Sequence, residues 1–150
     1  MALLNIGDKA PDINAFDHLG NQIYLSSFLG KKVVLYFYPR DNTPGCTLEA
    51  CNLRDNYYDL MAQGFVVLGV SADNEKSHQS FAEKFDLPFP LLVDTEKKII
   101  ADYGVWGPKK FMGKSFDGIL RTTFIISEKG IIEDIITKVD TKNHTSQILK

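Results

Sequence analysis

The sequence has little of several features that would mark particular classes of protein. Among its 150 residues there are only two cysteines and three histidines, and its 17 basic residues are outnumbered by 19 acidic ones. Because the basic residues are also scattered, we expect no binding to nucleic acid. No run approaches the ~18 apolar residues of a membrane span, and residues 1–13 lack the pattern of a secretion signal. The sequence therefore predicts a cytoplasmic protein that contacts no membrane.

The whole chain, residues 1–150, is predicted to form one domain. Its hydrophobic content of 44% is enough to bury a core without disulfides, and no linker or repeat divides it. In a reducing compartment, two cysteines are more often catalytic, redox-active or metal-binding than permanently cross-linked. Metal is the weakest of these options, because His18, His78 and His144 are far apart and the cysteines lack zinc-site spacing. We expect no metal and no cofactor.

The predicted elements alternate between strands and helices. Apolar, β-branched runs predict buried strands at residues 32–38 and 64–72, and the helical composition of residues 47–63 between them indicates a parallel βαβ unit. The remaining expected elements are a helix from residue 73 with Asp73 or Asn74 as its cap, a strand at 89–94, a helix at 96–104, two antiparallel strands at 121–127 and 130–137, and a helix from about residue 142. A central mixed β-sheet flanked by helices matches an α/β, thioredoxin-like fold.

The first cysteine stands at the predicted start of a helix. Thr43 suits the N-cap and Pro44 the first helical position, which puts Cys46 at the third. Unpaired backbone N–H groups and the positive end of the helix dipole favour a thiolate there. We therefore expect Cys46 to be the reactive thiol.

The second cysteine, Cys51, lies five residues further along the same predicted helix. In an ideal helix this spacing separates the two Cα atoms by roughly 8 to 9 Å, whereas a disulfide needs less than ~7 Å. A bond between Cys46 and Cys51 thus requires the helix to unwind, and a permanent disulfide in the native helix is excluded. Two interpretations of Cys51 stay open, an inert buried side chain and a partner in a switching disulfide.

The stretch PRDNTPGC, residues 39–46, matches the Pro-x-x-x-Thr-x-x-Cys signature of peroxiredoxins. The longer stretch YFYPRDNTPGCTLEAC resembles the subgroup called bacterioferritin comigratory protein or peroxiredoxin Q. Other stretches, among them GDKAPDI, LLVD, YGVWGPKK and TTFIIS, resemble the same subgroup in order over nearly the whole chain. On these motifs the chain is identified as a member of that family.

The resemblance implies a thioredoxin-dependent peroxidase that reduces hydroperoxides and serves antioxidant defence. Cys46 would be the peroxidatic cysteine, attacking the substrate as a thiolate and becoming a sulfenic acid. Thr43 and Pro39 would line the peroxide pocket, and Arg121 would hold the thiolate and the developing oxyanion. Cys51 would be the resolving cysteine, forming a Cys46–Cys51 disulfide that thioredoxin, or glutaredoxin in some members, reduces. The subgroup also implies a monomer.

Other residues near these motifs have ordinary interpretations. From the residues alone, Arg121 reads as a solvated arginine at a strand start, and only the resemblance gives it a role. Glu49 matches the subgroup, but an exposed acid in the first helical turn explains it adequately. Arg40 is either solvated or a source of positive potential, and Trp106 is expected to pack. The pocket walls are expected from Tyr36, Tyr38 and residues 106–116.

Two other functions remain as alternatives. A thiol-disulfide oxidoreductase shares the fold and an activated cysteine, but the chain lacks the Cys-x-x-Cys spacing of such enzymes. A redox sensor or holdase would use helix unwinding to expose apolar surface to a partner. That role is compatible with peroxidase activity and predicts oxidation-dependent binding without turnover.

Overall fold

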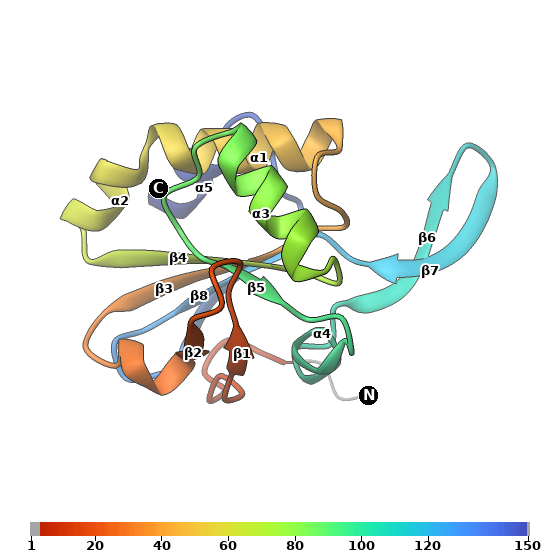
Figure 1. The fold of residues 1–150 in the computed structure, drawn as a ribbon. Coiled ribbons are helices and arrows are strands. Elements are labelled where there is room, and N and C mark those ends of the chain that lie inside the picture. Colours follow the sequence, from red (N-terminus) through yellow and green to blue (C-terminus); the bar gives the residue numbers. More distant parts are fainter. Residues whose placement is uncertain (1–3, 150) are drawn as a thin grey trace.

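The computed structural model describes residues 4–149 and is built on a five-stranded sheet with the strand order β5-β4-β3-β8-β9 (Figure 1). The strands are β3 (Lys32–Phe37), β4 (Phe65–Ser71), β5 (Leu91–Val93), β8 (Thr122–Ile126) and β9 (Ile132–Ile136). β3 pairs in parallel with β4, and β4 with β5, whereas β8 is antiparallel to both β3 and β9. The sheet is therefore mixed, as predicted.

Helices cover one face of the sheet, and a smaller helix and a hairpin lie against the other (Figure 1). The covering helices are α1 (Pro44–Asp55), α2 (Tyr57–Ala62), α3 (Glu75–Lys84) and α5 (His144–Leu149). The opposite face carries α4 (Lys98–Asp102), the hairpin of β1 (Asn14–Phe16) and β2 (Gln22–Tyr24), and the 3-10 helix η1 (Leu25–Phe28). Among residues 4–149, no helix has the length and apolar content needed to cross a membrane.

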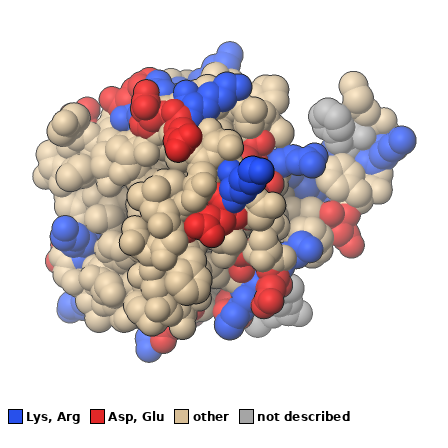
Figure 2. All heavy atoms as spheres, viewed as in Figure 1, with Lys and Arg blue, Asp and Glu red and all other residues tan. Residues whose placement is uncertain are grey.

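A second hairpin, β6 (Trp106–Phe111) and β7 (Lys114–Ile119), projects from the rest of the fold (Figure 1). Its outer part is exposed, and Met112 and Phe116 keep much of their surface in solvent. Acidic and basic side chains are interspersed over the face seen in Figure 2, the hairpin included. The last residue of β7 is buried, and two residues later the chain reaches Arg121, directly before β8.

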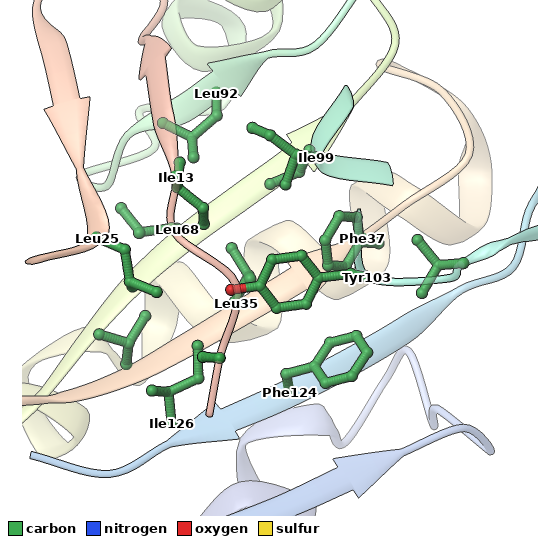
Figure 3. Close-up of a cluster of buried hydrophobic side chains, with 14 of the residues drawn as sticks. Ile13, Leu25, Leu35, Phe37, Leu68, Leu92, Ile99, Tyr103, Phe124 and Ile126 are labelled. Carbon is green, nitrogen blue, oxygen red and sulfur yellow. The ribbon is translucent and has the colours of Figure 1, made fainter. Parts of the chain in front are cut away.

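Alternate residues of β3 point into two separate hydrophobic cores. Leu35 and Phe37 join Leu68, Tyr103 and Phe124 in the core beneath the sheet (Figure 3). The intervening residues of β3 belong to the core under α1 and α3, namely Val34, Tyr36 and Tyr38 just after the strand. Successive side chains of a strand face opposite sides. The continuous apolar run therefore marks a strand buried on both faces, as predicted.

The predicted helix at residues 47–63 differs most from the structure. The start at Pro44 agrees with the predicted cap at Thr43, but the helix is broken at Asn56 into α1 and α2. The Asn56 side chain donates from Nδ2 to the Asn52 carbonyl at 2.8 Å, and such local side-chain bonds compete with the helical ladder. The predicted end at Gly64 is confirmed, with φ of 85°. The hairpins β1–β2 and β6–β7 were not predicted.

Gly69 in β4 offers a direct test of this packing. An added Cβ would lie 2.9 Å from Leu91 Cδ2 and 3.0 Å from two ring carbons of Tyr36, and both side chains are fully buried. We expect Gly69→Ala to destabilise the fold by about 1 to 3 kcal/mol through overpacking, which lowers Tm by roughly 3 to 10 °C. Thermal unfolding followed by circular dichroism measures this. An unchanged Tm would contradict the close contact between β4 and the Tyr36 ring.

Candidate active site

The segment between β3 and α1 is fixed by a buried polar cluster. Tyr38 donates from its hydroxyl to Asp41 Oδ1 at 2.6 Å, and the Asp41 backbone N–H donates to Asp73 Oδ2 at 2.8 Å. His78 Nδ1 lies 2.6 Å from Asp41 Oδ2, and its Nε2 lies 2.9 Å from the Leu92 carbonyl oxygen. These contacts tie the segment to α3 and, through His78, to β5.

Asp41, Asp73 and His78 are also the one group in the described part of the chain with ligand atoms close enough together for a metal ion. Their polar atoms already bond to one another and to neighbouring hydroxyls. Ser77 Oγ donates to Asp41 Oδ2 at 2.8 Å, and Ser71 Oγ donates to Asp73 Oδ2 at 2.6 Å. We interpret the cluster as the anchor of the segment before α1.

Helix α1 starts where the sequence predicts, but Thr43 does not cap it with its side chain. Thr43 has the extended conformation of an N-cap, Pro44 is the first helical residue and Cys46 is the third. The Thr43 hydroxyl instead donates to the Arg40 carbonyl at 2.8 Å. No side chain at the N-cap therefore competes for the backbone N–H groups of the first turn, which lie near the Cys46 thiol.

Arg121 connects the thiol to a carboxyl group. Its Nη2 donates to Cys46 Sγ at 3.3 Å, and its Nη1 donates to Glu49 Oε1 at 2.7 Å. Gly45 permits this approach, because a Cβ there would lie 3.2 Å from Arg121 Nη2. The expectation of a solvated Arg121 from the residues alone is wrong, since only 23% of its side chain is exposed.

Glu49 is fully buried, so its interpretation as an exposed acid is wrong. Burial raises its pKa from 4.5 to about 7, against the opposing effect of the Arg121 charge and hydrogen bond. Among the described residues no donor bonds to Glu49 Oε2, and His144 Nε2 lies 3.5 Å from it. Sequence reasoning could have placed Glu49, because it lies three residues after Cys46 and so on the same side of the helix.

Other charged and polar groups lie around this site. Burial tends to lower the pKa of Arg121, but Cys46 and Glu49 raise it further, so the guanidinium stays charged. Burial, with a smaller effect from Glu49 and Cys46, raises the pKa of Tyr36 well above its usual value, so this phenol is neutral. Its hydroxyl has no hydrogen-bond partner within residues 4–149. Lys109 donates from Nζ to the Ile119 carbonyl at 2.8 Å; burial and the nearby Arg121 lower its pKa. Lys109 belongs to the segment 106–116 that was expected to line the pocket, whereas His144 was not predicted near the site and no local motif marks it.

The structure brings together only some of the predicted site residues. Cys46 and Arg121 are in contact, and Cys46 is 1% exposed. Thr43 and half-buried Pro39 lie on the segment leading to α1, with no hydrogen bond to the thiol among the described residues. Cys51 is partly exposed, and both cysteines are free within one continuous helix. The two thiols are therefore held apart in this conformation.

Two other residues expected near the site have different surroundings. Tyr38 is fully buried in the polar cluster before α1. Trp106 is 37% exposed and has Lys97 Nζ 5.0 Å from its ring centre, a cation-π contact. The site itself is thus a buried thiol with a charged guanidinium beside it, an arrangement that stabilises a thiolate nucleophile.

The chain matches known proteins over most of its length. Residues 6–135 match the model of the AhpC/TSA family. Peroxiredoxin Bcp of Bacillus subtilis is 44% identical over 147 residues, which cover 98% of this chain and 94% of the relative. Peroxiredoxin Bcp of Escherichia coli is 44% identical over 146 residues, covering 97% and 94%.

Solved structures show the same fold. A cysteine-to-serine mutant of Xylella fastidiosa PrxQ has a TM-score of 0.92 at 30% identity, covering 99% of this chain and 95% of that one. The bacterioferritin comigratory protein of Xanthomonas campestris has a TM-score of 0.88 at 32% identity, with the same coverage. The thioredoxin-like fold and the resemblance noted in the sequence are confirmed. The chain belongs to the AhpC/TSA family, among the Bcp and peroxiredoxin Q proteins.

Proposed function

We propose that this chain is a thiol peroxidase that reduces hydroperoxides with Cys46 as its nucleophile. The observation that carries the proposal is the contact of 3.3 Å between Arg121 Nη2 and Cys46 Sγ, at the start of α1. A guanidinium at this distance stabilises the thiolate and is also positioned to bind an oxygen that acquires negative charge. Both are needed when a thiolate cleaves an O–O bond.

The reaction begins with attack of the Cys46 thiolate on one oxygen of the hydroperoxide. An S–O bond forms, the O–O bond breaks, and the other oxygen leaves and is protonated to an alcohol or water. Cys46 is then a sulfenic acid. Arg121 binds the developing oxyanion. The Thr43 hydroxyl, whose hydrogen is directed at the Arg40 carbonyl, accepts the hydrogen of the incoming hydroperoxide, and Pro39 shields the sulfenic acid from water.

In the second step, the Cys51 thiol condenses with the Cys46 sulfenic acid, which forms the disulfide and releases water. The part of α1 that holds the two cysteines has to unwind for this step, because helical geometry keeps Cys46 and Cys51 too far apart. The disulfide is then reduced by thiol exchange with thioredoxin or glutaredoxin. Because both thiols lie in one helix, a monomer can complete the cycle.

The hydroperoxide substrates include alkyl hydroperoxides as well as hydrogen peroxide. Support comes from the Xanthomonas campestris relative, whose structure is described in terms of alkyl peroxide reduction activity. We place the enzyme in the cytoplasm, where two free cysteines are kept reduced between turnovers. An oxidoreductase acting on protein disulfides fits less well, because a thiol with 1% exposure is inaccessible to a folded protein partner.

The decisive experiment is the intact mass of the reduced protein before and after one equivalent of hydrogen peroxide, with thiol counting. We expect the loss of two hydrogens and both thiols without dimer formation. Cys46→Ser should consume no peroxide, whereas Cys51→Ser should retain one oxygen on Cys46 and lose recycling by thioredoxin. A mass gain on Cys46 with Cys51 still free in the wild type would refute the resolving role, and no change would refute the peroxidase.

Substitution of Arg121 tests its role in the first step. Arg121→Lys keeps a positive charge beside Glu49 but lacks the fork that reaches both Glu49 Oε1 and Cys46 Sγ. We expect the second-order rate with peroxide, measured by stopped-flow fluorescence, to fall ~10-fold or more in Arg121→Lys and by ~10² to 10³ in Arg121→Ala. Arg40→Ala, an exposed arginine near the site, is the control. Rates equal to the wild type would remove Arg121 from the mechanism.

The buried Glu49 should make stability depend on pH. Its pKa of about 7 in the folded protein is above the ordinary 4.5, so the unfolded chain loses this proton first and stability falls as the pH rises from about 4.5 to 7. Glu49→Gln lacks this titration. Between pH 4.5 and pH 8, the wild type should lose roughly 3 kcal/mol relative to the variant, as measured by urea unfolding. Parallel pH profiles would show that Glu49 titrates normally.

A further inference from the structure

The C-terminal segment contacts α1 beside Cys51. Asn52, the next residue, accepts at Oδ1 from the Thr145 backbone N–H at 2.8 Å and donates from Nδ2 to the Lys142 carbonyl at 2.9 Å. Thr145 Oγ1 also donates to the Asn52 carbonyl at 3.3 Å. Three hydrogen bonds thus link one residue of α1 to residues 142–145.

This C-terminal segment is itself fixed to the central sheet. His144 is fully buried, with Nε2 2.7 Å from Thr123 Oγ1 on β8 and Nδ1 2.8 Å from Gln147 Oε1. The Gln147 amide is oriented by two further bonds, because its Oε1 accepts from the Asp140 N–H and its Nε2 donates to the Lys138 carbonyl. Asn52 is therefore bonded to a part of the molecule that is anchored independently of α1.

The contacts with the C-terminal segment cover the part of α1 that has to unwind. Glu49, between the two cysteines, lies against His144, and Asn52 follows directly after Cys51. Bringing Cys51 within bonding distance of Cys46 shortens a Cα separation of roughly 8 to 9 Å to less than ~7 Å. If Cys51 makes this shift of ~1 to 2 Å, its neighbour Asn52 moves with it, which takes hydrogen bonds of 2.8 and 2.9 Å beyond ordinary bonding distance.

We propose that Asn52 is a positioning residue for the resolving step: its bonds to residues 142–145 hold α1 helical and slow formation of the Cys46–Cys51 disulfide. This rests on the proposed function, in which Cys51 is the resolving cysteine. The sulfenic acid has two fates. Condensation with the Cys51 thiol gives the disulfide and water, whereas a second hydroperoxide oxidises it to a sulfinic acid and is reduced to an alcohol or water. Asn52 thereby sets how much peroxide the enzyme tolerates.

The test compares three variants in single turnovers without reductant. Asn52→Ala removes two of the bonds, and Thr145→Val removes only the hydroxyl bond to the Asn52 carbonyl. Asn143→Ala is the matched control, because the Asn143 side chain bonds only within its own segment, to Asp140 Oδ2. Rapid acid quench and mass spectrometry measure the rate of disulfide formation and the sulfinic fraction at increasing hydrogen peroxide. Stopped-flow fluorescence measures the first oxidation.

We expect disulfide formation to be roughly three- to tenfold faster in Asn52→Ala, with a sulfinic fraction lower by a similar factor and an unchanged first oxidation. Thr145→Val should show a smaller change in the same direction, and Asn143→Ala none. A general loss of stability would also change the rate of the first oxidation. A changed ratio of disulfide to sulfinic acid with an unchanged first oxidation therefore points to the resolving step.

Two results would overturn the proposal, and a third would refute the resolving role of Cys51 on which it rests. Disulfide formation in Asn52→Ala at the wild-type rate, or slower, would show that the bonds do not oppose unwinding, while the peroxidase cycle would stand. If Asn52→Ala does not fold, an unchanged rate in Thr145→Val overturns the proposal instead. Absence of the Cys46–Cys51 disulfide in the wild type would refute the resolving role of Cys51 itself.

Discussion

The site depends on one buried guanidinium that faces two groups capable of negative charge. Arg121 reaches Cys46 Sγ and Glu49 Oε1 with its two terminal nitrogens. A buried carboxylate is costly without a partner, and the raised pKa of Glu49, about 7, shows that Arg121 only partly offsets the effect of burial. When Glu49 carries a proton, the positive charge of Arg121 is balanced by the Cys46 thiolate alone. The two groups thus compete for one cation.

The sheet topology explains how residues so distant in sequence meet. β3 and β8 are antiparallel neighbours, and Phe37 at the end of β3 pairs with Thr122 at the start of β8. The residues that follow β3 and those that precede β8 therefore lie at the same edge of the sheet. α1 starts from this edge after the segment anchored by Asp41, and Arg121 lies there directly before β8. The contact between Arg121 and Cys46 therefore follows from the register in which β3 pairs with β8.

Much of this could be predicted from the sequence, and the parts that could not have a common physical cause. The βαβ unit, the antiparallel final strands and the position of Cys46 in α1 depend on local patterns, such as the apolar run of β3 and Pro44 at the first helical position. Three features depend instead on groups that local sequence does not reveal. They are the burial of Glu49, the break at Asn56, and the hydrogen bond that the Thr43 hydroxyl donates to the Arg40 carbonyl in place of a cap. Local propensity contains no information on such partners. The hairpin β6–β7 was missed for another reason: it is short and exposed, and its strands have little apolar periodicity.

The proposed cycle requires a helix α1 that is stable enough to hold the Cys46 thiol in the site and weak enough to unwind after the first step. Four residues of α1 are buried, namely Cys46, Glu49, Ala50 and Leu53, and only Leu53 has a large apolar side chain. The helix therefore depends strongly on polar contacts, from Arg121 at one end and Asn52 at the other. In the proposed cycle the Cys46 thiolate becomes a neutral sulfenic acid, so the charge that attracted Arg121 is lost and the first of these contacts weakens. Oxidation thus removes part of what keeps α1 folded, so that the chemistry of the first step favours the conformational change that the second step requires.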